Sequence, residues 1–276
     1  MVKEIEADAK SFGDARRTLI QAEKKAVAEV RIVDEPVTVV VSVKGWVRAL
    51  KGHEVDRASL SFKSGDALYG VFPCRSVDPL VILGSSGRAY SVSVSSLPGG
   101  RGDGSPITTL IELETGTQVA QFYAGAPETL LLWASSAGYG LMARVGDLVG
   151  RQRAGKSFLS LEAGEQVLPP ARVAESHTQV ACLAADGRLL VFAREELKLQ
   201  PGGGRGLTLM DVDAKNPLAS VASFKSVLQV SGQGRGGKAK EERLGAAGLQ
   251  DHQGKRARKG RKIEGFVKPL QLLSVD

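Results

Sequence analysis

A β-hairpin pattern recurs five times along this 276-residue chain and constrains its fold more than any other feature. The clearest copy joins an apolar run, Leu130–Trp133, to a second strand-like run, Gly140–Val145, through a turn of small residues. Two apolar runs of strand length on either side of such a turn are typical of a β-hairpin. The five turn glycines lie at intervals of 42, 51, 49 and 47 residues and are Gly45, Gly87, Gly138, Gly187 and Gly234. A chain with such a period folds by repeating one small unit.

This period favours an all-β, propeller-like disc of about five four-stranded blades. Arrays of four-stranded blades repeat every ~40–50 residues, which matches the spacing of the turn glycines. Three copies also share a small or polar turn, a glycine, then Arg or Tyr, and a closing pair that ends in leucine. The connection 59–74 is expected to supply the remaining strands of the first blade. An ordinary β-sandwich with similar hairpins is the alternative.

The first 34 residues differ from the rest of the chain and predict a helical tether. Ala, Glu, Lys, Arg and Gln dominate residues 3–31, with an interruption at 12–14 and near-helical spacing of apolar residues after it. The sequence Asp34-Glu35-Pro36 ends this segment and opens the first strand. The chain is therefore divided into a tether from an upstream region, residues 1–34, and a β domain, residues 35–276.

Several classes of protein and of site are disfavoured. No apolar run reaches the ~20 residues of a membrane span, and the N-terminus lacks the apolar core of a secretory signal, so a cytoplasmic protein is expected. Cys74 and Cys182 lie in apolar runs, which predicts buried free thiols. His53, His177 and His252 are scattered without the spacing of metal ligands. Because P-loop and GxSxG motifs are also missing, we expect no metal, no cofactor and no catalysis within these residues.

The net charge of +7 is concentrated near one end of the chain. Residues 35–231 carry 19 basic and 18 acidic side chains, whereas residues 232–262 carry ten basic and three acidic ones. Most loops that leave the hairpins nevertheless place glycine next to Arg or Lys. Equivalent loops of a radial array lie around one rim, so their cations are expected to form a curved belt.

Such a belt suits the phosphates of duplex DNA. Glycine allows close approach of the backbone, Arg and Lys supply the charge, and curvature favours bent DNA. A solvated charged rim is the alternative. The candidate phosphate contacts on return strands and exit loops are Arg48, Lys51, Arg88, Arg101, Arg144, Arg151, Arg153, Lys156, Arg188 and Arg205. A further candidate cluster, which could instead be a disordered loop, contains Lys255, Arg256, Arg258 and Lys259.

Five stretches carry a family resemblance: PVTVVVSVKGWVRALKGHEVD, SSGRAYSVSVSSLPGGRGDGSPIT, SSAGYGLMARVGDLVGRQRAGKSFLSL, EQVLPPARV and AADGRLLVFAREEL. Together they resemble the C-terminal domain of the A subunit of bacterial DNA topoisomerase IV. The segment 5–28, with DAKSFGDARRTLI, resembles the tail that leaves the breakage-reunion core of the same polypeptide. The resemblance implies a β-pinwheel whose blades exchange strands with their neighbours, and it leaves closure of the disc undecided.

The resemblance also implies a function. In that family the domain binds and bends double-stranded DNA without sequence preference and helps a type II topoisomerase select substrates for supercoil relaxation and decatenation, which serves chromosome segregation. It implies a monomeric, nucleoid-associated domain whose partners are the breakage-reunion core and the B subunit of an A2B2 holoenzyme. ATP and Mg²⁺ serve the complete enzyme, whose catalytic tyrosine lies upstream of this chain. The related gyrase domain wraps DNA with a QRRGGKG box, and only the degenerate GRQRAGK at 150–156 is present here.

Two other functions remain open from the sequence. A protein-binding scaffold would present an apolar patch on one face of the disc, and a propeller enzyme would present a central pocket with convergent polar groups. The chain's four tyrosines lie in or beside the expected strands and are expected to serve packing: Tyr69, Tyr90, Tyr123 and Tyr139.

Overall fold

The computed structural model describes residues 1–13, 33–100 and 102–275, and the chain divides into two units, Met1–Arg31 and Ile32–Asp276. In the first unit, helix α1 spans Val2–Phe12, and none of its residues is buried. The expected N-terminal helix is therefore present over this stretch. The rest of the predicted tether, from residue 14 to residue 32, lies outside the described residues. Within the described part of the chain, no helix has the length and apolar content needed to cross a bilayer.

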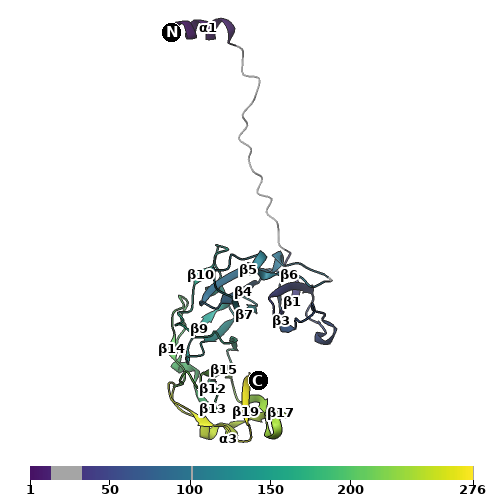
Figure 1. The fold of residues 1–276 in the computed structure, drawn as a ribbon, viewed down its shortest axis with the longest axis vertical. Helices are drawn as coiled ribbons and strands as arrows, with labels where there is room; N and C mark the ends of the chain where they lie inside the picture. Colours follow the sequence, from purple (N-terminus) through teal and green to yellow (C-terminus); the bar gives the residue numbers. More distant parts are fainter. Residues whose placement is uncertain (14–32, 101, 276) are drawn as a thin grey trace. The chain divides into compact units, whose positions relative to one another are not determined.

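The second unit consists of five small antiparallel sheets, which are the predicted blades, arranged as an arc (Figure 1). The first hairpin strands are β1 (Pro36–Ser42), β4 (Pro79–Gly84), β8 (Leu130–Ala134), β12 (Gln179–Ala184) and β16 (Leu228–Gln233). Their partners after the turn are β2 (Trp46–Lys51), β5 (Arg88–Ser93), β9 (Tyr139–Arg144), β13 (Arg188–Ala193) and β17 (Ala239–Leu244). All five predicted hairpins are confirmed, with the turn glycines between their strands.

The first four hairpins are extended by a strand on both sides, and the fifth is extended on one side. A third strand pairs with the first one: β3 (Leu68–Arg75), β7 (Val119–Ala124), β11 (Ala171–Val173), β15 (Leu218–Phe224) or β19 (Lys268–Ser274). A short fourth strand pairs with the second one in four blades: β6 (Ser105–Pro106), β10 (Lys156–Ser157), β14 (Leu207–Thr208) and β18 (Arg261–Lys262). Two further one-turn helices are α2 (Val145–Leu148) and α3 (Ala246–Leu249). The fifth blade is the sheet β17-β16-β19 and has three strands.

The fourth strand of a blade comes from the next repeat along the chain. Strand β6 follows the second hairpin, yet it pairs with β2 of the first blade through Trp46 and Pro106. The same exchange places β10 on β5, β14 on β9 and β18 on β13. The expectation that the connection 59–74 completes the first blade is therefore wrong, because this connection supplies β3 alone. The strand exchange implied by the family resemblance is what the blades show.

An apolar residue behind each exchanged strand fastens it to the hairpin that receives it. Its N–H donates to the carbonyl oxygen of the turn glycine, at 2.7–2.9 Å, in the pairs Ile107–Gly45, Leu159–Gly87, Leu209–Gly138 and Ile263–Gly187. All four apolar side chains are at most 9% exposed. The backbone bond and the burial together hold consecutive repeats in register.

The hydrophobic core consists of four clusters, each between two neighbouring blades. In β4, Leu80 and Ile82 belong to the cluster shared with the first blade, whereas Val81 and Leu83 belong to the cluster shared with the third. Successive strand residues point to opposite faces, so a blade packed on both sides needs apolar residues at every position. This explains the unbroken apolar runs of the hairpin strands.

The two ends of the arc are finished differently. On the first blade, the loop after β2 folds back over the sheet, where Arg48 Nη2 donates to the Ser61 carbonyl at 3.1 Å and Lys63 Nζ lies 3.4 Å from the Trp46 ring centre. On the fifth blade, the face away from the core carries polar side chains together with the partly exposed Leu273. There Gln229 Nε2 donates to Glu241 Oε2 at 3.2 Å.

The cysteines and tyrosines occupy the positions expected of packing residues. Cys74 and Cys182 are buried free thiols, which confirms their predicted state. Tyr90 is buried, and the Tyr69 ring lies edge-on to a core phenylalanine. Within the described residues, no group of His, Cys, Asp and Glu side chains has the arrangement of a metal site.

Candidate nucleic-acid interface

The loops that lead into the exchanged strands form a continuous belt. We define the belt as the described residues of four loops, each of which ends in a fourth strand: 98–100 with 102–106, 149–157, 199–208 and 253–262. Neighbouring loops are joined by backbone hydrogen bonds, for example from Ser160 N to Gly204 O at 3.1 Å and from Asp211 N to Arg258 O at 3.1 Å. Figure 1 shows β10 and β14 on the convex side of the arc and β7 and β15 on its concave side. The belt therefore follows the outer side of the blades.

The belt brings together two groups of the predicted cations. Arg151, Arg153 and Lys156 lie in one loop, and Arg153 Nη2 donates to the Thr109 carbonyl at 2.7 Å. Lys156 Nζ donates to the Val149 carbonyl at 3.0 Å. These bonds to neutral carbonyls orient Arg153 and Lys156, and no acidic side chain of the described residues forms an ion pair with either of them.

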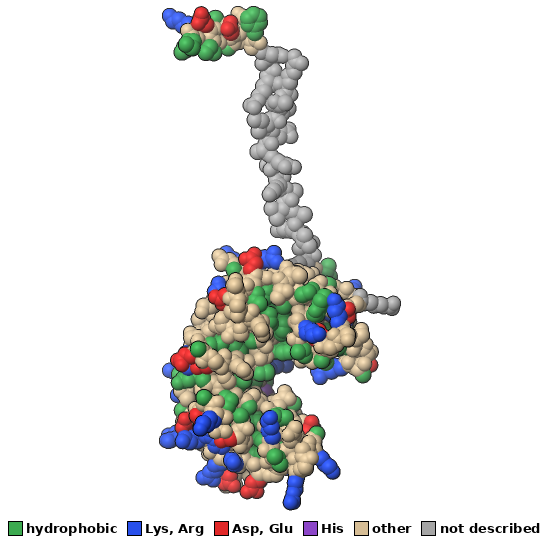
Figure 2. Space-filling view, viewed as in Figure 1, with side chains coloured by type: hydrophobic (Ala, Val, Ile, Leu, Met, Phe, Trp, Pro, Cys, Tyr) green, Lys and Arg blue, Asp and Glu red, His purple; other side chains and the backbone are tan. Residues whose placement is uncertain are grey.

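The second group lies in the last belt loop and contains Lys255, Arg258 and Lys259, all exposed. Arg261 and Lys262 follow in β18, which pairs with β13, so this stretch is an ordered part of the fourth blade and not a disordered loop. The space-filling view shows Lys and Arg side chains projecting from the lower part of the arc, where β13, β17 and α3 lie in Figure 1 (Figure 2). Arg261 forms an ion pair with Asp251 at 3.7 Å, whereas none of the ion pairs among the described residues involves Lys255, Arg258 or Lys259.

Three other predicted residues hold the belt in place. Arg48, Arg88 and Arg188 lie on the second strands of their hairpins, and each donates to a main-chain carbonyl of the loop that crosses its blade. Arg48 reaches the Gly102 carbonyl and is only 6% exposed. Arg88 Nε lies 2.5 Å from the Ala154 carbonyl oxygen. A buried or half-buried guanidinium in this position fixes the course of the loop.

In the third blade Tyr139 occupies the position directly after the turn glycine that Arg88 and Arg188 occupy in their blades. The Arg205 guanidinium lies 4.2 Å from the Tyr139 ring centre and forms two hydrogen bonds with the Glu165 carboxylate, at 2.6 and 3.2 Å. These hydrogen bonds raise the pKa of Arg205 above its ordinary value. Because Glu162 lies 3.4 Å away as well, the charge of Arg205 is compensated within the fold.

The remaining predicted residues lie elsewhere. Lys51 and Arg144 are exposed but lie at the ends of β2 and β9 that are far from the turns, outside the belt. Arg256 is half-buried and donates to the Thr208 carbonyl at 2.6 Å, so it fastens one belt loop to the preceding one. Arg101 lies outside the described residues. The sequence reasoning missed the loop-holding role of the arginines, although Arg follows the turn glycine in three repeats, at Arg88, Arg188 and Arg235.

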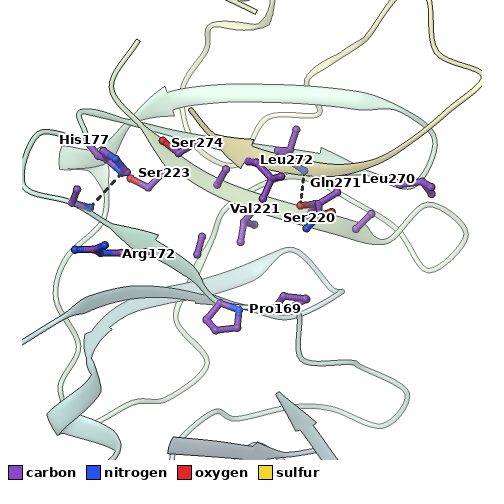
Figure 3. Close-up of a pocket in the computed structure, with 16 residues that line it drawn as sticks. Pro169, Arg172, His177, Ser220, Val221, Ser223, Leu270, Gln271, Leu272 and Ser274 are labelled. Atoms are coloured by element: carbon purple, nitrogen blue, oxygen red, sulfur yellow. Dashed lines mark hydrogen bonds between the residues drawn. The ribbon is translucent and has the colours of Figure 1, made fainter. Parts of the chain in front are cut away.

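A pocket of about 630 Å³ opens between the third strands of the last three blades (Figure 3). Its titratable lining residues are Arg172 and His177. The polar groups here join neighbouring elements, as when Leu272 N donates to Ser220 Oγ at 3.0 Å and Ala174 N donates to His177 Nδ1 at 3.3 Å. These contacts serve packing, and they do not favour the alternative of a propeller enzyme.

Comparison with known proteins places this architecture in a family. No protein-family model matches the chain. The A subunit of DNA topoisomerase 4 from Neisseria gonorrhoeae is 38% identical over 282 residues, which cover 98% of this chain and 36% of the relative. A solved structure of the Escherichia coli ParC C-terminal domain has a TM-score of 0.75 and 30% identity, and the match covers 86% of this chain and 98% of that one.

The chain belongs to the family of C-terminal domains of the topoisomerase IV A subunit. This ParC-type domain shares its fold with the DNA gyrase A C-terminal domain, whose solved structure has a TM-score of 0.63 at 18% identity and covers 88% of this chain. The family resemblance in the sequence is thereby confirmed, as is the propeller-like arrangement of five blades. The chain spans about a third of the length of the curated relatives it matches.

Proposed function

We propose that this domain binds double-stranded DNA along the belt, without sequence preference, and bends it around the convex side of the arc. Two groups of cations without an ion pair among the described residues carry the proposal, on equivalent loops of the same side: Arg151, Arg153 and Lys156, and Lys255, Arg258 and Lys259. Contacts to phosphates supply most of the affinity of non-specific DNA binding and carry no sequence information. Two charged groups separated by the neutralised Arg205 loop favour a duplex that curves to reach both.

Family membership supports a further role in a complete topoisomerase IV. There the domain would present DNA of a preferred topology to the breakage-reunion core of the same polypeptide, next to the B subunit in the A2B2 enzyme, for supercoil relaxation and decatenation. Strand cleavage, ATP and Mg²⁺ belong to other parts of that enzyme in this proposal, which places the domain on the bacterial nucleoid. Gyrase-like wrapping is disfavoured, because the degenerate box 150–156 lies in the third repeat.

The test is the affinity of the 276-residue chain for a 40-base-pair duplex across a salt series, with two unrelated sequences. Equal affinities are expected, with a salt dependence that corresponds to ~4–8 phosphate contacts. The triple variant Arg151→Ala, Arg153→Ala, Lys156→Ala is expected to reduce the logarithmic slope by ~2–3. The matched control removes three exposed cations outside the belt, Arg57, Arg172 and Lys215, and should leave most of the slope in place.

Bending is measured separately, by energy transfer between dyes at the two ends of the same duplex. The end-to-end distance is expected to shorten on binding. A flat salt dependence together with undetectable binding would contradict the whole proposal. The exposed apolar side chains of β19, Leu270 and Leu273, would then favour the protein-binding scaffold.

A further inference from the structure

The hairpin of the fifth blade differs from the other four at its tip. In the first four blades the carbonyl of the turn glycine accepts an N–H from the exchanged segment, which therefore covers the turn. In the fifth blade Gly234 N donates to Lys238 O of the same hairpin at 2.8 Å, and the described residues supply no exchanged segment. This turn is also longer, with five residues between β16 and β17. The tip is thus an uncovered loop.

The chemistry of this tip matches that of the belt. Its residues 234–238 have the sequence Gly-Arg-Gly-Gly-Lys, and Arg235 and Lys238 are exposed. Neither side chain forms an ion pair within the described part of the chain. Gly236 and Gly237 both have φ of 74°, and a Cβ atom on either would meet nothing within 4 Å. A glycine backbone in open space between two cations can approach a phosphate closely.

The other turns lack this combination. The second and fourth hairpins turn through Ser85-Ser86 and Ala185-Asp186, which carry no cation. Lys44, the one cation of the first turn, is exposed and donates at 3.4 Å to the carbonyl of Ser64, in the loop that folds back over that blade. Among the described hairpins, the fifth is therefore the one that carries two cations on an uncovered turn.

The tip also lies where the belt would continue. Each exchanged strand pairs with the first two residues after a turn, as in Arg188 with Lys262 and Leu189 with Arg261, so the belt runs beside the turns. Its last loop crosses the fourth blade next to Gly187. The next turn along the arc is that of the fifth blade, which none of the described loops crosses.

We infer that the tip of the fifth hairpin, residues 234–238, is a second DNA-contacting element that binds phosphates of the same duplex beyond the end of the belt. This inference rests on the proposed function and extends its footprint to the last blade. A two-stranded β-ribbon is slim enough to approach the edge of a DNA groove, where phosphates of both strands are accessible. The tip would thereby fix the far end of a duplex that the belt has curved.

The experiment uses the double variant Arg235→Ala, Lys238→Ala in the whole chain with the 40-base-pair duplex. Loss of two phosphate contacts is expected to lower the logarithmic salt slope by ~1.8 and the affinity about tenfold near physiological salt. The matched control compares Arg235→Ala with Arg243→Ala, which removes the same charge from the other end of the same blade. Arg243→Ala is expected to change affinity less than twofold. Unchanged melting temperatures verify that the variants fold.

A second measurement locates the contact. Gly236→Cys, labelled with a thiol-directed photocrosslinker, is expected to crosslink to duplex DNA, because the tip is exposed and faces the bound duplex. This inference would be overturned if the triple belt variant lowered the salt slope, the double tip variant did not, and the labelled tip formed no crosslink to DNA. That result would leave the proposed function standing. Failure of both variants to change the slope would instead contradict the proposed function.

Discussion

Gly138 lies directly against the carbonyl oxygen of Met210, so that a Cβ atom at position 138 would collide with it. The two residues belong to successive repeats, and the contact forms where the segment behind β14 crosses the turn of the third hairpin. The glycine also has φ of 84°, a conformation that side chains disfavour. A turn glycine here serves the exchange of strands as well as the turn itself.

Gly138→Ala is expected to destabilise the domain by about 2–4 kcal/mol, because strain in the backbone adds to overpacking. Gly164→Ala is the matched control, since Gly164 has the same φ of 84° and a Cβ there would meet nothing within 4 Å. The control substitution is expected to lower the free energy of unfolding by about 1 kcal/mol. Urea unfolding followed by circular dichroism measures both, and equal costs would show that the contact with Met210 is unimportant.

Leu209→Ala is expected to reduce the free energy of unfolding by about 2–5 kcal/mol, since the side chain is fully buried between the third and fourth blades. Leu270→Ala removes the same atoms from a side chain that is 46% exposed and should cost within about 0.5 kcal/mol. Denaturant titrations at equal protein concentration provide the comparison. A small effect at Leu209 would mean that the exchanged segments do not stabilise the blades.

Arg205→Ala is expected to lower the melting temperature, because it leaves the Glu165 carboxylate, whose side chain is 9% exposed, without its partner. Arg75→Ala is the control, since Arg75 forms an exposed ion pair with Asp34 and should have little effect. Arg205→Lys is expected to restore only part of the loss, as lysine cannot form the two-point contact. Full restoration by lysine would contradict this role of the guanidinium.

Burial raises the pKa of the Cys74 thiol to about 11, with a further contribution from the charge of Asp78. The folded protein therefore keeps this proton at pH values where the unfolded chain has lost it. It follows that the stability contributed by Cys74 is complete below pH ~8.5 and declines as the pH rises towards 11. Unfolding titrations at about pH 8 and about pH 10 should show this decline, and Cys74→Ala should show a smaller one.

The same burial predicts slow alkylation of Cys74 and Cys182 in the folded domain, because the reactive thiolate is disfavoured. Both thiols are expected to react with iodoacetamide near neutral pH only after unfolding in urea. Mass spectrometry after a timed reaction provides the measurement. Rapid modification of either cysteine in the native protein would contradict the burial of its thiol.

The hairpins could be predicted from the sequence because each is local: an apolar run, a glycine turn and a second run lie close together in the chain. The fourth strands could not, since a two-residue strand such as Ser105–Pro106 has no periodicity and pairs with β2 of the preceding repeat. In the sequence, the connection directly after β2 is the nearest candidate for the fourth strand of the first blade. Nothing local indicates that this strand comes from a later repeat. The family resemblance, unlike the periodicity, implied the exchange correctly.

The belt was predictable as a set of equivalent loops, but the roles of its arginines were not. Arg88 and Arg188 lie beside glycine in the sequence, as Arg151 does, and only the fold separates them. The first two donate to main-chain carbonyls of later repeats, whereas Arg151 is exposed. Their contacts with DNA therefore remain predictions, and the side-chain geometry makes Arg151 the more accessible candidate.

Because the fourth strand of a blade comes from the next repeat, the blades can be completed only in a fixed order during synthesis. The first four blades can each be finished only after the following repeat has left the ribosome, whereas the fifth needs no later segment among the described residues. A growing chain therefore carries one blade with an open edge, which closes when the next repeat arrives. Termination before the fifth repeat would remove that blade and also leave β13 without β18. Each truncation by one repeat therefore removes one blade and leaves the second hairpin strand of the preceding blade without its fourth-strand partner.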